Sequence, residues 1–423
     1  MVSAILGPRR VGKTTLVKNF INENPQNLWV TLNMDVLSEQ QEIEKIGLAQ
    51  KIERMTTQKI GANKKIWVAI DEAQKYPALF NQIKTLYDQF KDKNAIKFIL
   101  TGSGVLNLHQ LSAESLAGRI ELYHLYPFTT RETCSLLYPQ NNPPDSLSLP
   151  ILDLIFANPP TLDLQTQLDM LSPFQTLLEN SLHTQLIWGG LPEVLQETNL
   201  EVRIKYLGNY LQTYLEKDVR ALSTITDLAL YHKLMQIIAQ QTGSVRQNKK
   251  ITDVLACKSE TLKKYRGFLE ATLLYQELYP FINSSLKRLT KSPKGYLSDN
   301  GLISYLTDIY DMNILTQTGL IGARLENWLL NEIQVTLKRS PRISNLYFWQ
   351  TSAGREIDFI IQKGNLIFPF EVTYGAKPTI EKIRNLQAFM LAEKVARGFY
   401  VYNGEYRYDA KTNIYFIPAW AVG

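Results

Sequence analysis

The chain has 423 residues, of which 45% are apolar and 20% charged, and its formal net charge is +6. Because one hydrophobic core rarely serves more than about 250–300 residues, we expect two or three globular domains. No apolar run reaches the roughly 18 residues of a membrane helix, and Cys134 and Cys257 have neither disulfide nor metal spacing, which predicts a cytoplasmic protein without membrane contact.

The N-terminal part of the chain alternates between short apolar runs and helical patterns. Apolar runs over 2–6, 28–33, 66–70 and 97–101 predict buried strands. Apolar side chains at helical spacing predict helices over 14–22 and 79–90. This alternation predicts an α/β fold with a parallel sheet that is covered by helices on both faces.

The segment between the first strand and the first helix carries a phosphate-binding motif. Residues 7–14 fit the pattern G-x-x-x-x-G-K-[ST], in the strand-to-helix context that this motif requires. Glycines allow backbone N–H groups to turn toward phosphate oxygens, and the following helix adds the positive end of its dipole. We expect Lys13 to reach the β- and γ-phosphates of ATP and the Thr14 hydroxyl to bind Mg²⁺. The expected nucleotide-binding residues are Gly7, Pro8, Arg9, Arg10, Val11, Gly12, Lys13, Thr14 and Thr15.

Polar residues near the later strands complete the expected ATP site. Asp71 follows the third strand and is expected to hold the Mg²⁺ shell, while Glu72 is expected to polarise the attacking water. Ser103 follows the fourth strand and is our choice for sensing the γ-phosphate. Arg119 precedes another short apolar strand and is a candidate for neutralising charge on the transferred phosphoryl group. On spacing alone, two alternatives are equally well supported: a simple polar turn at Ser103 and a solvated side chain at Arg119.

The composition changes twice along the rest of the chain. Prolines interrupt the pattern between about 138 and 173, so we expect an ATPase domain over 1–135 and a linker or irregular insertion over 136–173. A mostly helical, winged-helix-like domain is predicted over 174–310. A nuclease-like α/β domain is predicted over 311–423, with strands near 346–350, 356–361, 366–372 and 398–402.

The positive charge is concentrated in residues 246–294. This segment has eleven basic and four acidic residues, an excess of seven against a net charge of +6 for the whole chain. Within it, residues 251–280 have the pattern helix, turn, helix and strand, with Ser259 as a helix cap and Lys263, Lys264 and Arg266 on the second helix. Clustered positive charge favours contact with DNA, and the alternative is a small helical domain used for packing or for contact with a protein partner.

Three acidic residues near the end of the chain have the order found in a group of nucleases. Glu326 lies on a predicted helix, Asp358 within a strand and Glu371 within the next strand. This order resembles the PD-(D/E)xK nucleases, which implies a second Mg²⁺ site at these residues. Thr373 stands where the nuclease motif has lysine, and Lys377 lies beyond a glycine turn. We therefore expect a nuclease-like fold with impaired activity; the alternative is an α/β domain with a buried acid pair.

The motifs taken together resemble one family. Residues 7–15, 70–74, 100–103 and 116–119 are similar to motifs of the prokaryotic AAA-type P-loop ATPases of the STAND-like branch. In that family a domain of unknown function follows the ATPase, and its motifs resemble residues 188–193, 210–219, 291–296 and 299–302. The resemblance covers nearly the whole chain except 138–173 and implies an AAA-like core. A helical segment that covers the adenine usually precedes the first strand in the family, whereas Met1 lies almost on that strand here, so we expect weaker base recognition.

The preferred hypothesis is an ATP-dependent molecular switch or motor. Closure around the γ-phosphate would move the later domains, which contact DNA or a protein partner. One alternative is an ATP-regulated DNA nuclease of a mobile-element or defence system. Another is a DNA-binding regulator that holds the nucleotide as a static ligand. The sequence leaves the oligomeric state open.

Overall fold

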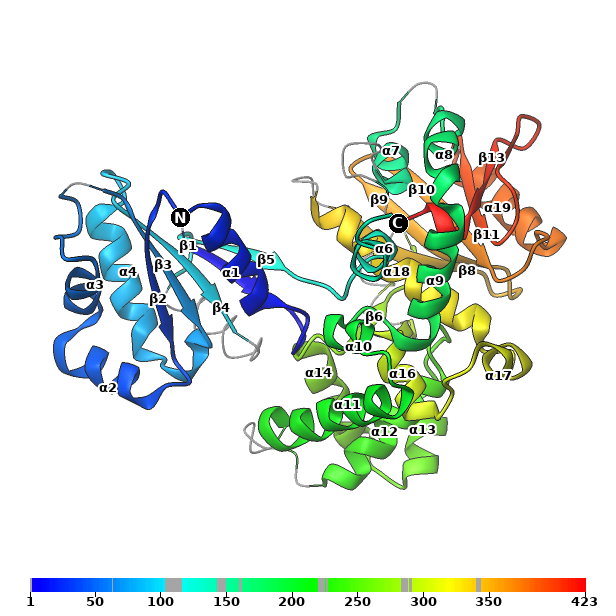
Figure 1. Cartoon of the computed structure of the whole chain (residues 1–423). Coiled ribbons are helices and arrows are strands. Elements are labelled where there is room, and N and C mark those ends of the chain that lie inside the picture. Colours follow the sequence, from blue (N-terminus) through cyan, green and yellow to red (C-terminus); the bar gives the residue numbers. More distant parts are fainter. Residues whose placement is uncertain are drawn as a thin grey trace. The chain divides into compact units, whose positions relative to one another are not determined.

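The computed structural model divides the chain into two units (Figure 1). The first spans residues 1–126 and includes the short segment 271–273, and the second spans 127–270 and 274–423. The structure describes all residues except 1, 63, 103–115, 142, 144–149, 160–161, 220–224, 226, 283–287, 289–290 and 340–343. The second unit contains both of the regions that the sequence predicted as separate helical and nuclease-like domains.

A five-stranded parallel sheet forms the centre of the first unit. Its strands are β1 (Val2–Leu6), β2 (Leu28–Asn33), β3 (Ile66–Asp71), β4 (Ile96–Thr101) and β5 (Ile120–His124). Its helices include α1 (Lys13–Glu23), α2 (Leu37–Ile46), α3 (Leu48–Thr56) and α4 (Ala78–Phe90). The strand order is β2-β3-β4-β1-β5, and every neighbouring pair is parallel. The predicted α/β fold with a parallel sheet is therefore confirmed.

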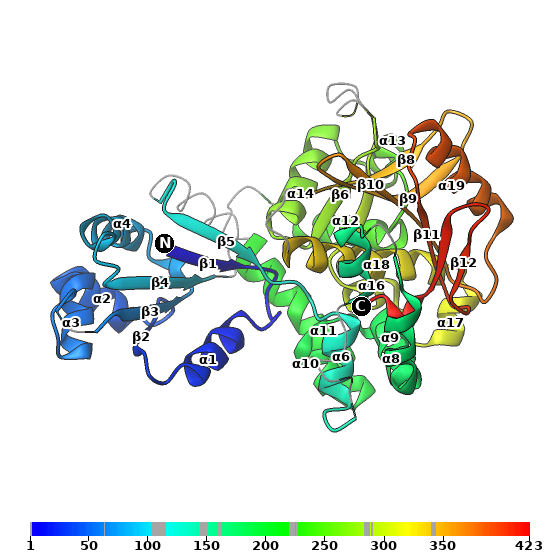
Figure 2. The ribbon, with the colours of Figure 1, turned by 90° about the horizontal axis from the view of Figure 1, so that it is seen from above.

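Helices cover both faces of this sheet, as Figures 1 and 2 show. On one face, Val68 and Phe98 belong to a large apolar core that is shared with α3 and α4. On the other face, Val17 of α1 packs against Ala69 and Ile99. Successive side chains of a strand point to opposite faces, so the continuous apolar runs of β3 and β4 supply both cores.

The parallel arrangement brings the carboxyl ends of the strands to one edge of the sheet. Leu6, Asp71 and Thr101 are the last residues of β1, β3 and β4. The chain leaves β1 through α1 toward β2, while β5 lies on the other side of β1. Open α/β sheets bind ligands at the carboxyl edge, beside a strand where the connections diverge in this way.

Helices dominate the first part of the second unit. They include α6 (Thr130–Leu137), α7 (Ile151–Ala157), α8 (Gln165–Leu171), α9 (Gln175–Trp188), α10 (Pro192–Gln196), α11 (Leu200–Thr213), α12 (Leu228–Gln240), α13 (Asn248–Leu255), α14 (Ser259–Ala271), α16 (Asn300–Thr307), α17 (Met312–Gln317) and α18 (Ile321–Arg339). None of the helices within the described ranges combines the length and the apolar character needed to cross a membrane.

Residues 136–173 differ from the predicted linker or irregular insertion. They contain α7 and α8, whose side chains Ile151, Ile155 and Leu168 are buried in the largest apolar core of the second unit. Pro150 directly precedes α7, where a missing backbone N–H costs little. At this position the proline marks the start of a packed helix, which the composition of the segment did not reveal.

A small antiparallel sheet follows α14. Strand β6 (Tyr275–Leu278) pairs with β7 (Lys294–Leu297), and an isolated bridge joins Val245 to Lys294. The elements α13, α14 and β6 follow one another in the order helix, helix and strand that the sequence predicted for 251–280.

A six-stranded mixed sheet forms the last part of the second unit. Its strands are β8 (Ser344–Gln350), β9 (Glu356–Lys363), β10 (Leu366–Thr373), β11 (Gly398–Tyr402), β12 (Arg407–Asp409) and β13 (Ile414–Pro418), in the order β12-β13-β11-β10-β9-β8. Leu329 of α18 packs with Phe370 on one face. Phe389 of helix α19 (Ile380–Ala392) packs with Tyr400 on the other. The sheet therefore lies between α18 and α19.

Two of the motifs singled out in the sequence pack against each other in the second unit. Asp299 accepts hydrogen bonds from the backbone N–H of Gly190 at 2.7 Å and of Gly301 at 2.8 Å, which caps α16. A Cβ atom on Gly301 would lie 2.3 Å from the carbonyl oxygen of Trp188, so this close approach requires glycine. Burial raises the pKa of Asp299 to about 6. These motif residues therefore join α9 to α16.

Candidate ATP site and C-terminal acidic cluster

The phosphate-binding motif forms the turn from β1 into α1. Gly12, which directly precedes α1, has a φ of 97° that side-chain-bearing residues rarely adopt. Lys13 is only 8% exposed, and its Nζ donates to the carbonyl oxygens of Gly7 at 2.9 Å and Pro8 at 2.7 Å. The ammonium group therefore lies inside the loop that is expected to surround the phosphates.

Asp71 lies at the centre of the predicted magnesium site. The Thr14 hydroxyl donates to Asp71 Oδ2 at 2.9 Å, and the Thr101 hydroxyl donates to Asp71 Oδ1. Thr101 ends β4, which is the neighbour of β3 in the sheet. The structure thus brings together the two residues predicted to bind Mg²⁺, and they supply the hard oxygen ligands that this ion prefers.

Glu72 directly follows β3 and has a left-handed backbone conformation, with a φ of 50°. For a residue with a side chain, this conformation costs on the order of 1 kcal/mol. The Glu72 carboxylate accepts a hydrogen bond from Gln74 Nε2. The backbone turn and the amide of Gln74 together hold the carboxylate beside Asp71.

Sequence reasoning missed two polar residues of this site, Thr101 and Gln74. The signal for Thr101 was present, because it ends a predicted strand next to the strand that carries Asp71. Gln74 gave no such signal, since its side chain reaches Glu72 only through the short turn that follows β3. Ser103, the predicted γ-phosphate sensor, lies outside the described residues.

Arg119 lies at the opposite edge of the sheet from the phosphate loop. It directly precedes β5, whose first residue Ile120 pairs with Val2 at the start of β1, whereas Gly7 follows the end of β1. At about 3.3 Å per strand residue, the two edges are separated by roughly 13 Å or more. The Arg119 guanidinium donates to both carboxylate oxygens of Asp88, at 2.7 and 2.9 Å. The predicted contact between Arg119 and a phosphoryl group is therefore not made within its own unit, because the strand direction sends this residue to the wrong edge.

The basic residues of 246–294 differ in how far their side chains are exposed. Arg246 forms an ion pair with Glu277, Arg266 is buried, and Arg288 donates to a tyrosine hydroxyl at 2.6 Å. Lys294 is only 1% exposed. The exposed lysines are Lys249, Lys250, Lys258, Lys263, Lys264 and Lys291. The charge available to a partner therefore comes mainly from α13, α14 and the residues beside them.

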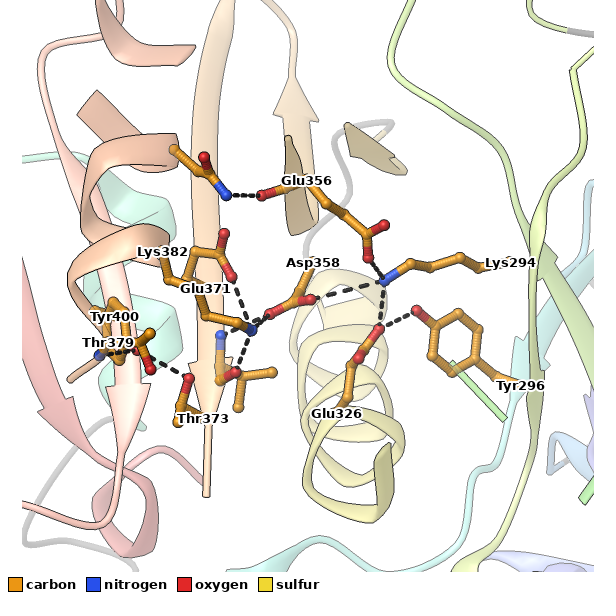
Figure 3. Close-up of polar contacts among 12 residues, drawn as sticks. Lys294, Tyr296, Glu326, Glu356, Asp358, Glu371, Thr373, Thr379, Lys382 and Tyr400 are labelled. Carbon is orange, nitrogen blue, oxygen red and sulfur yellow. Dashed lines mark hydrogen bonds and ion pairs between the residues drawn. The ribbon is translucent and has the colours of Figure 1, made fainter. Parts of the chain in front are cut away.

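The acids predicted as a second metal site lie together in the second unit (Figure 3). Glu326 comes from α18, Asp358 from β9 and Glu371 from β10. Lys382 of α19, which sequence reasoning missed, donates to Asp358 Oδ2 at 2.8 Å and lies 3.0 Å from Glu371 Oε2. The cation absent from position 373 therefore reaches the acids from a later helix.

A second lysine reaches the acids from β7, on the other side of Asp358 in Figure 3. Lys294 Nζ lies 3.0 Å from Glu326 Oε1, 2.5 Å from Glu356 Oε1 and 3.7 Å from Asp358 Oδ1. Tyr296, two residues further along β7, donates to Glu326 Oε1 at 2.5 Å. We call Glu326, Glu356, Asp358, Glu371, Lys294 and Lys382 the acidic cluster.

The arrangement does not fit the predicted metal site at Glu326, Asp358 and Glu371. The described part of the chain contains no group of three or more His, Cys, Asp or Glu residues that is placed to hold a metal ion. The physical reason is that the carboxylates face Lys294 and Lys382.

Burial and the two lysines shift the pKa values of Glu371 and Asp358 in opposite directions. Burial raises the pKa of Glu371 well above its usual value, and the charge of Asp358 raises it further. Burial alone would also raise the pKa of Asp358, but Lys382 and Lys294 lower it below its ordinary value. Burial opposes the charge on Lys294, but the surrounding carboxylates raise the pKa of this ammonium group. The two ammonium groups therefore favour the ionised form of Asp358, whereas burial and the charge of Asp358 favour the protonated form of Glu371.

Comparison with family models identifies the parts of the chain. Residues 1–134 match the model of a family described as AAA domain, residues 179–313 match a domain of unknown function (DUF8612), and residues 321–422 match another (DUF4143). The N-terminal part is therefore an AAA-type P-loop ATPase domain, and a domain of unknown function lies at the C-terminal end. This confirms the resemblance drawn from the phosphate loop and from residues 70–74.

Two curated relatives match almost the whole chain. They are uncharacterized proteins of Mycobacterium bovis and of Mycobacterium tuberculosis, each 25% identical over 420 residues, which are 99% of this chain and 80% of the relative. Among solved structures, the Walker-type ATPase PABY2304 of Pyrococcus abyssi is 18% identical, with a TM-score of 0.44 over 72% of this chain and 90% of that one. The ADP form of the ORC2 protein of Aeropyrum pernix is 14% identical, with a TM-score of 0.31 over 73% of this chain and 87% of that one.

Proposed function

We propose that this protein is an ATP-dependent molecular switch or motor that binds and hydrolyses Mg-ATP in its first unit and contacts DNA with its second. The observation that carries the proposal is the grouping of Lys13, Thr14, Asp71 and Glu72 at the carboxyl edge of one parallel sheet. A basic loop, two oxygen ligands for a metal ion and a further carboxylate are the parts that phosphoryl transfer to water requires.

Lys13, Thr14 and Asp71 are assigned to the binding of Mg-ATP. Lys13 exchanges its hydrogen bonds to the carbonyl oxygens of Gly7 and Pro8 for bonds to phosphate oxygens. The Thr14 hydroxyl and the Asp71 carboxylate, which now bond to each other, fit the coordination shell of Mg²⁺. When bound, Mg²⁺ neutralises charge on the phosphate oxygens.

Glu72 is assigned to orienting and polarising the attacking water. Gln74 holds its carboxylate, and Asp71 Oδ1 accepts a hydrogen bond from the backbone N–H of Glu72 at 3.0 Å. Thr101 bonds to the same oxygen of Asp71 and is assigned a positioning role. Arg119 receives no role at the nucleotide of its own subunit, because it lies at the opposite edge of the sheet.

The contact with DNA is assigned to α13, α14 and the β6–β7 ribbon, which have the order of elements of a winged helix. Leu262, Tyr265 and Leu269 of α14 are buried, while Lys263 and Lys264 are exposed. Exposed lysines on a helix that packs through its other face suit phosphate contacts, which give affinity without sequence information. Repositioning of this region during the ATP cycle is the proposed output of the switch.

The two described cysteines, Cys134 and Cys257, are unpaired, which suits a reducing compartment. We include a cytoplasmic location in the proposal on this basis.

ATP hydrolysis by the full chain, with and without duplex DNA, tests the proposed function. We expect turnover that DNA accelerates, and we expect Glu72→Gln to abolish turnover while nucleotide binding stays within about threefold of the unsubstituted protein. Turnover that Glu72→Gln leaves unchanged would contradict the assignment of the site. Binding without turnover under both conditions would favour the alternative of a regulator with a static nucleotide. DNA-independent turnover would favour a protein partner.

A further inference from the structure

The fold of the last domain raises the question of a metal ion, since its acids have the order found in PD-(D/E)xK nucleases. Glu326, Asp358 and Glu371 converge as that resemblance implies. Their oxygens, however, are not directed at a shared open position. The contacts of Lys294 and Lys382 decide whether these residues fit a divalent ion.

Lys294 occupies the space between three carboxylates. Its Nζ lies 3.0, 2.5 and 3.7 Å from oxygens of Glu326, Glu356 and Asp358 respectively. The side chain is 1% exposed, and the backbone of Lys294 is fixed by pairing with Leu278 and by the bridge to Val245. The ammonium group is therefore part of the folded core and cannot swing into solvent while β7 stays paired.

Lys382 occupies the other side of Asp358. It donates to Asp358 Oδ2 at 2.8 Å and to the carbonyl oxygen of Val372 at 2.7 Å, and it lies 3.0 Å from Glu371 Oε2. The backbone N–H of Val372 donates to the same Oδ2 atom at 2.9 Å. Oδ2 thus accepts from two donors and Oδ1 lies 3.7 Å from Lys294 Nζ, so each oxygen of Asp358 lies beside an ammonium group.

Charge leads to the same conclusion. A buried carboxylate needs a partner, because an unpaired ion in the protein interior costs several kcal/mol. Two ammonium groups already supply that partner to the cluster. A divalent ion placed beside them would be repelled by both, at distances where Coulomb interactions in a protein are strong. The cluster therefore does not require a metal ion to fold, and it opposes the entry of one.

We infer that Lys294 and Lys382 are built-in counter-ions that take the place of a divalent metal ion in the acidic cluster, so that the last domain is a nuclease-like fold that holds no metal. This inference is independent of the ATP site. It also argues against the alternative that the protein is a metal-dependent nuclease.

The binding of Mn²⁺ to the full chain tests the inference, with free Mn²⁺ followed by electron paramagnetic resonance. All proteins carry Asp71→Asn and are free of nucleotide, so that the first unit contributes as little as possible. We expect the protein with Lys294 to have no Mn²⁺ site that depends on Asp358. One equivalent of Mn²⁺, lost on Asp358→Asn, would overturn the inference.

Removal of the ammonium group gives the complementary test. We expect Lys294→Met to create a Mn²⁺ site with an apparent affinity at least about tenfold tighter than before, because Glu326 and Glu356 then lack their cation and Asp358 keeps only Lys382. Mn²⁺ should also raise the melting temperature of this variant alone. Lys291→Met, which removes an exposed lysine three residues away, is the matched control and should leave Mn²⁺ binding unchanged.

Lys382→Met is the second variant to test if Lys294→Met fails to fold. The Lys382 side chain is 32% exposed, and this variant leaves Lys294 in place. Failure of a folded variant to gain Mn²⁺ would overturn the inference. If neither variant folds, the measurement on the protein with both lysines decides alone.

Discussion

Replacing Lys13 by alanine is the most direct test of the phosphate loop. In the folded protein the ammonium group is nearly buried and bonded to two backbone carbonyls, so it is held close to where the phosphates would bind. Each hydrogen bond between charged groups contributes about 1.5–3 kcal/mol, but the bonds to the carbonyls are given up when the nucleotide enters. A net loss of about 2–3 kcal/mol corresponds to ATP binding that is roughly 30- to 150-fold weaker.

Titration of a fluorescent ATP analogue, with competition by unlabelled ATP, measures this loss. Lys45→Ala, which removes an exposed lysine near the end of α2, is the control and should change the affinity by less than about twofold. Circular dichroism verifies that both variants are folded. A Lys13→Ala protein with unchanged ATP affinity would refute the assignment of the whole loop.

Further predictions concern DNA and pH. The double substitution Lys263→Ala and Lys264→Ala should weaken DNA binding and lower the slope of log K against log salt by about two, measured by fluorescence anisotropy; an unchanged slope would argue against α14 as the DNA contact. Burial raises the pKa of Glu332 from 4.5 to about 7, so the folded state binds this proton more tightly than the unfolded state does. The contribution of Glu332 to stability is therefore fully present below about pH 4.5 and is lost as the pH rises through 7. Glu332→Gln keeps the group neutral, and its stability relative to the original protein should increase by about 2–3 kcal/mol between pH 5 and pH 8 in urea denaturation; a difference that does not change with pH would contradict this.

The ATP domain was largely predictable because its signals are local. The motif at 7–14 and the strand before Asp71 are each contained in a few consecutive residues, and the sheet places them together through its parallel order. The position of Arg119 at the amino edge of the sheet could also have been predicted from the sequence. A residue that precedes a parallel strand lies at the amino edge, whereas the phosphate loop follows the carboxyl end of β1.

The acidic cluster was predictable only in part, because its cations come from distant elements. The alternation along β9 predicted that Ile357 and Phe359 share a face, which is wrong: Ile357 packs with Phe389 and Phe359 with Phe370, because the pairing with β8 is irregular between residues 357 and 360. Lys382 lies beyond a turn on α19, and Lys294 lies on a separate sheet. No spacing rule relates either lysine to Asp358, since the contacts depend on how these elements pack.

The side chains of β7 make the charge of the acidic cluster depend on the register of the β6–β7 hairpin. Lys294 and Tyr296 are two residues apart, so both point from the same face of β7 toward Glu326. A slip of one residue in the pairing with β6 would present Gly295 together with either Pro293 or Leu297 to the carboxylates, and none of these residues carries a charge. Four acids would then lose one of their two cations inside the protein. The acidic cluster thus favours the native register of the β6–β7 hairpin, because this register places the ammonium group of Lys294 among the carboxylates.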